Sequence, residues 1–242
     1  ILLALAFAAG TPALFDVPGG PLPCSSGGAG ALVSGGRFVL QASYDLASAS
    51  GTLRRHEATG DGFADIASWD AAQLLGAQTE REIHTLAYGS DGRSMTVDFT
   101  WDRLPDASRT LLDAGDGLGE ARVNFLRGDR SRELGQEGGV FRTRASVMGD
   151  VVNSVPLLVG APSVSVQGPG YARFHADHRS RPATVYVGAN DGMLHAFAAS
   201  DGTELFAYVP NALHAALPEL SKPGYIHRAW VDGSPGHGEA FI

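Results

Sequence analysis

The 242-residue chain is poor in cysteine and in charge, and it has no long hydrophobic run. Its single cysteine, Cys24, excludes an internal disulfide, a cysteine-based zinc site and haem attachment. Charged residues make up 18% of the chain, the net charge is −8, and lysine and arginine do not cluster. The apolar run at residues 1–10 is too short to span a bilayer. We therefore expect no nucleic-acid partner and no membrane-spanning segment.

Glycine and proline, by contrast, are frequent, with 32 and 13 residues, which favours many short strands joined by turns. The most informative stretch is VYVGANDGMLHAFAASDGTELFAYVP at 185–210, where the Asp191-Gly192 and Asp201-Gly202 turns join three apolar runs. Asp-Gly between such runs indicates a hairpin, because glycine adopts the positive φ of a tight turn. A three-stranded meander of this kind is typical of a β-propeller blade. The predicted fold is mainly β, a partial propeller with quinoprotein-like blades and a few short helices.

The rest of the chain gives weaker signals. Residues 1–36 have the composition of a linker or of the tail of an upstream domain, and residues 1–10 are either the end of a helix or a signal-peptide remnant. Residues 161–182 are expected to form a loop. The apolar pattern predicts strands at 37–46, 51–58, 81–88, 94–101, 151–160, 229–231 and 239–242, and helices at 68–75, 106–112, 119–126 and from Asn211 to about Pro218.

Four ordered segments carry a resemblance to a known family. They are VNFLRGDR at 123–130, GDVVNSVP at 149–156, the 185–210 meander, and GYIHR with VDGSP between 224 and 235. Their order and spacing resemble the start of the C-terminal propeller of the PilY family, the type IV pilus biogenesis and tip-associated proteins. On this resemblance, residues 37–242 are the N-terminal part of a PilY-like propeller, clearest from residue 121. Ala49 stands where the family pattern leads us to expect a tryptophan.

The resemblance implies a non-catalytic scaffold and adhesion module that supports pilus biogenesis, twitching motility and surface adhesion. It implies minor pilins or other pilus-tip components as partners, and also host-surface receptors. The location would be the cell surface or pilus tip of a Gram-negative bacterium, outer-membrane-associated or periplasmic. Calcium is expected for the full-length family, but its loop of alternating aspartates is not found in this chain, so no cofactor is assigned to any residue here.

The chain begins with Ile1 rather than methionine, so we expect a propeller cut at both ends. Such a piece cannot pair its first blade with its last, and we expect it to be prone to aggregation when isolated.

The blade pattern also leaves an enzyme open, as part of a quinone-dependent (PQQ-type) dehydrogenase propeller. Blades of those enzymes usually close on tryptophan, where this chain has Phe206, and several use adjacent cysteines, which a single Cys24 cannot supply. Fold alone does not decide between these functions. No catalytic residue is predicted.

Arg127-Gly128-Asp129 is a candidate adhesion tripeptide of the integrin-binding type. The alternative is structural: Gly128 ends a helix, and Arg127, Asp129 and Arg130 form a local ion-pair cluster. A tripeptide this short recurs by chance, which favours the structural interpretation.

Other polar groups are also interpreted structurally. Asp113, Asp116 and Glu120 lack the alternate spacing of a calcium loop and predict a turn and a helix start. His175 and His178 are expected on a solvated loop, and His195 as a packing or surface residue. No metal site is predicted. The blade turns are assigned a structural role; they comprise Asp191, Gly192, Asp201, Gly202, Asp232 and Gly233.

Overall fold

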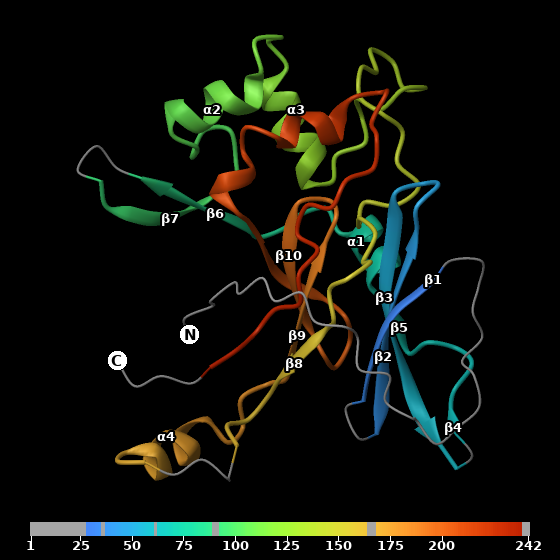
Figure 1. Cartoon of the computed structure of the whole chain (residues 1–242), viewed down its shortest axis with the longest axis vertical. Coiled ribbons are helices and arrows are strands. Elements are labelled where there is room, and N and C mark those ends of the chain that lie inside the picture. The colour runs from blue at the N-terminus through green and yellow to red at the C-terminus, as the bar shows by residue number, and fades with distance from the viewer. Residues whose placement is uncertain (1–27, 35–36, 61, 89–91, 164–167, 239–242) are drawn as a thin grey trace.

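The computed structural model describes residues 28–34, 37–60, 62–88, 92–163 and 168–238, and it arranges them around two β-sheets (Figure 1). The first sheet follows the order β1-β2-β3-β4, with β5 paired to β3. All of its pairings are antiparallel. Its strands are β1 (Gly28–Ser34), β2 (Phe38–Asp45), β3 (Ser50–Thr59), β4 (Gly62–Phe63) and β5 (Trp69–Asp70).

The second sheet contains the predicted meander. Its order is β7-β6-β11-β10-β9-β8, antiparallel throughout except for the parallel pair β6–β11. The meander prediction is confirmed, and this sheet does not close on itself within the described residues. Its strands are β6 (Ile83–Tyr88), β7 (Ser94–Asp98), β8 (Leu157–Val159), β9 (Thr184–Ala189), β10 (Met193–Ala198) and β11 (Glu204–Val209).

Short helices complete the structure. They are α1 (Ala71–Ala77), α2 (Asp106–Asp113), α3 (Gly119–Arg127), α4 (Tyr171–His178) and the 3-10 helices η1 (Asn211–Leu213) and η2 (Leu217–Ser221). Helices α2 and α3 lie together at one end of the molecule, and α4 projects at the opposite end (Figure 1). The predicted helices at 106–112 and 119–126 are confirmed, and Gly128 ends α3 with a φ of 118°. None of the helices in the described part of the chain is long and apolar enough to cross a membrane.

Both Asp-Gly turns of the meander require glycine for two reasons. Gly192 and Gly202 have φ values of 92° and 75°, a region that disfavours side chains. A Cβ at Gly192 would lie 2.7 Å from Leu217, and one at Gly202 would lie 2.6 Å from Trp69. These turns therefore satisfy the local backbone and also let neighbouring elements pack closely.

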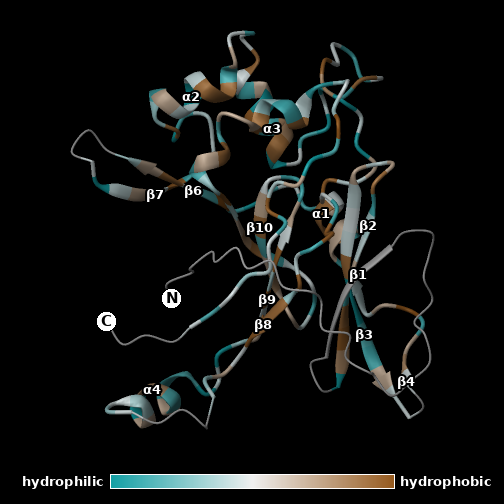
Figure 2. Ribbon diagram, in the orientation of Figure 1, coloured by the Kyte–Doolittle hydropathy of each residue, from teal (hydrophilic) through white to brown (hydrophobic). Residues whose placement is uncertain are grey.

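Strands β9 and β10 of the meander are buried on both faces, which explains their nearly continuous apolar runs. One face contributes Val187 and Phe197 to a core shared with Leu40, Leu53 and Trp69 of the first sheet. The other face, with Tyr186 and Leu194, packs against Val231 and its neighbours. A third core lies between the sheet and α2, α3 and η2. Figure 2 shows hydrophobic ribbon along the central strands and α3.

Two predicted elements begin later than expected. The helix predicted at 68–75 spans 71–77, because Trp69–Asp70 pairs with β3 and the Asp70 side chain accepts from the Gln73 amide as N-cap. The helix continues through Gly76. The strand predicted at 151–160 is restricted to β8, which begins directly after Pro156.

For other segments, the predicted type of secondary structure was wrong. The loop expected at 161–182 contains helix α4. The helix expected from Asn211 is two 3-10 helices, with Pro218 near the start of the second instead of the end of the first. Residues 229–231 form no strand, because the Trp230 amide donates to the Asn190 side chain. Part of the expected linker, 28–34, forms β1. The strand expected at 239–242 and the segment 1–27 lie outside the described residues.

Candidate functional site

Three of the four segments that resemble the PilY family meet in space. Asp150, from the segment after α3, is 1% exposed. Its Oδ2 accepts hydrogen bonds from Asn190 Nδ2 at 2.7 Å and from His227 Nε2 at 2.7 Å. Asn190 lies at the start of the β9–β10 turn, and His227 lies in the C-terminal segment. One buried carboxylate therefore joins stretches that are 40 and 77 residues away in the sequence.

Further hydrogen bonds lock the same three stretches. Asp232 accepts from the backbone amide of Asn153 at 3.0 Å and from its side-chain amide at 2.5 Å. Asn190 Oδ1 accepts from the Trp230 amide at 2.8 Å. We call the group of Asp150, Asn153, Asn190, His227 and Asp232 the three-segment junction. Asp232, predicted as a blade-turn residue, thus acts as an anchor for the 149–156 segment.

A second buried network lies within the meander and includes Arg81, which comes from outside it. His195 on β10 is 0% exposed, and its Nδ1 lies 2.7 Å from Glu204 Oε1 on β11. Its Nε2 lies 3.1 Å from Asp191 Oδ2. Arg81 donates to both oxygens of Glu204, at 2.6 and 2.8 Å. These four residues form the His195 network. The Gly149 amide donates to Asp191 at 2.9 Å and so connects this network to the three-segment junction.

The electrostatics of the His195 network follow from its pairing. Burial alone lowers the pKa of His195, but the charge of Asp191 and the hydrogen bonds to Asp191 and Glu204 outweigh it and raise the pKa to about 9. Burial raises the pKa of Glu204, but hydrogen bonds from His195 and Arg81 prevail and lower it to about 2. The pKa of Asp191 is lowered by His195 against the effect of its burial. At neutral pH the network holds two cations and two carboxylates.

This arrangement holds backbone segments together. Both ring nitrogens of His195 contact carboxylates, and both oxygens of Glu204 contact Arg81. Arg81 also donates through Nη1 to the carbonyl of Arg127 at 3.0 Å, which ties the end of α3 to the blade. Each charge of the network therefore has an opposite charge beside it.

The candidate adhesion tripeptide lies at the end of α3. Arg127 donates to the carbonyls of Phe99 at 3.2 Å and Arg81 at 2.9 Å. Its guanidinium therefore joins the end of α3 to the backbone of two other segments. Asp129 is exposed and accepts from Ser131. The ion-pair cluster expected among Arg127, Asp129 and Arg130 was wrong, because Arg130 pairs with Glu133. Adhesion through this tripeptide stays a prediction.

The acidic turn before α3 is structural in its contacts. Asp113 accepts from the Gly119 amide at 3.0 Å, and Asp116 accepts from the Leu118 amide and from Arg122. Across the described ranges, no group of three or more histidine, cysteine or acidic residues is placed to hold a metal ion.

Of the remaining sites, Asp201 caps its own turn by accepting from the Thr203 amide. His175 and His178 lie on helix α4, which has no buried residue.

Sequence reasoning missed the His195 network. His195 is a buried packing residue, one of the two alternatives expected from the sequence, but that expectation did not include its two carboxylate partners. One signal was present: His195 alternates with Leu194 and Ala196 and shares its face with Met193 and Phe197, so it is a polar residue in an inward position. Its partner Arg81 lies 123 residues from Glu204 and could not have been paired with it from the sequence.

Strands β8 to β11 form an antiparallel four-stranded blade with Asp-Gly turns, and the parallel β6–β11 pair extends the same sheet. This arrangement identifies the protein class as a propeller-type β-domain. Residues 148–239 match the model of the PilY1 beta-propeller domain family. These residues belong to this family. Its sheets and few short helices are the mainly β fold that the sequence predicts.

Most of the chain is also similar to proteins named as type IV pilus biogenesis factors. The chain is 37% identical over 231 residues to the type IV pilus biogenesis factor PilY1 of Pseudomonas aeruginosa strain PAK, covering 85% of this chain and 19% of that protein. It is 48% identical over 119 residues to a PilY1 homolog of Xylella fastidiosa, and this match covers 46% of the present chain and 10% of the homolog. The chain thus spans about a fifth of the length of the first of these relatives. No solved structure is significantly similar to it.

Proposed function

We propose that this chain acts in type IV pilus biogenesis as a non-catalytic scaffold and adhesion module, and that it supports twitching motility. The observation that supports the proposal is that three of the four segments resembling the PilY family meet at the three-segment junction. The polar residues of these segments bind one another and fix the blade. They contribute a rigid frame for loops that meet other proteins.

The partners in this proposal are minor pilins or other pilus-tip components, and the site of action is the cell surface or pilus tip, outer-membrane-associated or periplasmic. Host-surface receptors are further candidates for the adhesion role. The relatives named as pilus biogenesis factors support the pilus part of the proposal. Calcium is proposed only for the longer protein, through a loop that this chain does not contain.

The quinone-dependent dehydrogenase remains the competing hypothesis, and it rests on the blade pattern. In the structure, Phe206 packs edge-on against Tyr186, with 6.3 Å between the ring centroids, at the position where tryptophan would close a quinoprotein blade. Dye-linked alcohol oxidation by the purified protein with added quinone would favour the enzyme; family membership favours the pilus.

The test is genetic. In the source bacterium, deletion of the gene that encodes this chain should reduce the number of surface pili and the twitching zone. Complementation with the wild-type gene or with Asp177→Asn, an exposed change on α4, should restore both. Asp150→Asn should restore them incompletely, because it removes the charge at the centre of the three-segment junction. Normal piliation and twitching in the deletion strain would overturn the proposal.

A further inference from the structure

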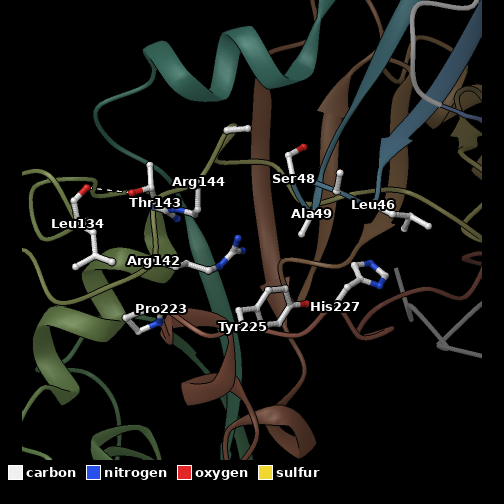
Figure 3. A pocket seen from close by; sticks show the side chains of 12 residues that line it. Leu46, Ser48, Ala49, Leu134, Arg142, Thr143, Arg144, Pro223, Tyr225 and His227 are labelled. Carbon is white, nitrogen blue, oxygen red and sulfur yellow. Dashed lines mark hydrogen bonds between the residues drawn. The ribbon is translucent and has the colours of Figure 1, made fainter.

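A cavity of about 490 Å³ lies beside the three-segment junction (Figure 3). Three parts of the chain form its walls: the β2–β3 hairpin tip at 46–49, the loop at 134–145 and the segment at 223–227. Its size is within the range of pockets that hold small ligands or single side chains. The cavity is separate from the buried His195 network, and the proposed function makes no use of it.

The charges beside this cavity are unbalanced. Arg144 and Arg130 both pair with Glu133, at 2.8 and 3.1 Å. A third guanidinium, that of Arg142, lines the cavity. Among the residues that the structure describes, no carboxylate lies within ion-pair distance of Arg142. Glu133 therefore has two guanidinium partners, whereas Arg142 has no ion-pair partner and feels Glu133, Asp150 and Asp191 only from a greater distance.

Arg142 is held in place and still has donors to offer. Its Nε donates to the Leu220 carbonyl at 2.7 Å, and its guanidinium lies 4.6 Å from the centre of the Tyr225 ring. These two contacts do not use the terminal nitrogens Nη1 and Nη2 as hydrogen-bond donors. Figure 3 shows the side chain extending between Thr143 and Tyr225 into the open space. A half-buried cation that is fixed and has no counter-ion of its own favours an anionic ligand.

The walls indicate which anion fits. Leu46 and Leu134 are 51% and 47% exposed, and together with Pro223 they give the cavity an apolar rim. A guanidinium binds a carboxylate through two parallel hydrogen bonds, and one such group balances one carboxylate charge. A phosphate dianion would need more cationic donors than the single unpaired Arg142 supplies. The combination of one guanidinium and an aliphatic rim suits a carboxylate carried by a short apolar chain.

We propose that this cavity binds a peptide carboxylate, with Arg142 as its cation and Leu46, Leu134 and Pro223 as its apolar rim. Two sources share this chemistry, an acidic side chain and a C-terminal carboxylate. In either case the peptide approaches between the hairpin tip and the 134–145 loop and places its carboxylate near the Arg142 terminal nitrogens.

The test is a titration with three peptides of the isotope-labelled 242-residue chain, followed by NMR at a concentration where light scattering shows it to be monomeric. Acetyl-Gly-Leu-Glu-Gly-amide carries only a side-chain carboxylate, acetyl-Gly-Leu-Gln-Gly only a C-terminal one, and acetyl-Gly-Leu-Gln-Gly-amide neither. At least one acidic peptide should shift the signals of Thr143, Tyr225 and Ala47, and the neutral peptide should not. The peptide that binds identifies the source. Equal binding of all three peptides, binding of none, or tighter binding of inorganic phosphate would overturn the proposal.

Variants separate binding from folding. Arg142→Gln should weaken binding roughly tenfold or more, as expected for loss of a charged hydrogen-bond pair. Arg103→Gln, a change at an arginine whose side chain is 69% exposed, is the matched control and should bind like wild type. Because Arg142→Gln also loses its contact with Leu220, Ala47→Trp provides a second route that fills the cavity from the exposed hairpin tip and leaves Arg142 intact. Unchanged affinity in a folded Ala47→Trp protein would contradict the proposed location.

Discussion

Replacement of His195 should destabilise the protein more than any change at an exposed histidine. The ring is 0% exposed and lies between Asp191 and Glu204, at 3.1 and 2.7 Å. In His195→Gln, the neutral amide cannot balance these carboxylates. Glu204 keeps Arg81, but Asp191 retains only backbone donors, from Gly149 and Met193. The variant therefore contains a largely buried carboxylate without a cation.

Two independent estimates of the cost agree. Removing one partner of a buried ion pair lowers the free energy of unfolding by about 3–5 kcal/mol. The pKa of His195 is raised from 6.5 to about 9, and at about 1.4 kcal/mol per unit this corresponds to about 3 kcal/mol of stabilisation of the protonated ring.

The same pKa shift fixes the sign of the pH dependence. A raised pKa in the folded state stabilises the protein fully below the unfolded value of 6.5, and this stabilisation disappears as the pH rises through about 9. Wild type should therefore lose stability between pH 6.5 and 9. The variant should be less stable at pH 7, and the difference between the two proteins should shrink towards pH 10.

Urea unfolding at pH 6.5, 8 and 10, followed by tryptophan fluorescence, measures both effects. His175→Gln, on helix α4, which has no buried residue, is the matched control. The reasoning is refuted if His195→Gln and the control unfold within about 0.5 kcal/mol of each other at pH 7, the range usual for surface substitutions. It also fails if the two variants have parallel pH profiles.

Three further predictions follow from the structure. Gly202→Ala should lower the free energy of unfolding by about 1–3 kcal/mol, from the positive φ and the contact with Trp69, whereas Gly168→Ala, which meets no neighbour, should change it little; thermal melts measure both. Asp232→Asn should weaken the bonds to Asn153 and speed amide hydrogen exchange at 226–238, and unchanged exchange would contradict its role as an anchor. Burial lowers the pKa of His214 from 6.5 to about 4, so the folded state disfavours the protonated ring. The free energy of unfolding should therefore fall as the pH drops from 6.5 to 4. In urea unfolding, His214→Gln should make this loss of stability at acid pH smaller.

The sequence predicted features whose cause is local. Asp191-Gly192 and Asp201-Gly202 define their turns through residues next to each other, and Gly128 ends α3 for the same reason. The order of the family-type segments then identified the propeller. These signals depend on backbone preferences that are independent of distant neighbours.

What the sequence could not predict depends on distant partners. Residues 229–231 have the composition of a strand, yet the Trp230 amide bonds to the Asn190 side chain instead of a neighbouring strand. Helix α4 was missed because polar residues interrupt its apolar positions, and indeed it buries no residue. The three-segment junction joins residues 40 to 79 positions apart, and Arg81 enters the His195 network from 123 positions away from Glu204. No local pattern encodes such pairs.

The parallel pairing of β6 with β11 bears on how the chain is made. Ile83 pairs with Ala207, so β6 has to wait until about 120 further residues have been synthesised before its neighbour exists. Until then one edge of the β6–β7 hairpin has unpaired backbone groups, and such long-range pairing is slow to form. Chains terminated before β11 would present this bare edge to one another and to proteases. Synthesis of β11, rather than of β6 and β7 alone, is therefore the step that protects this edge.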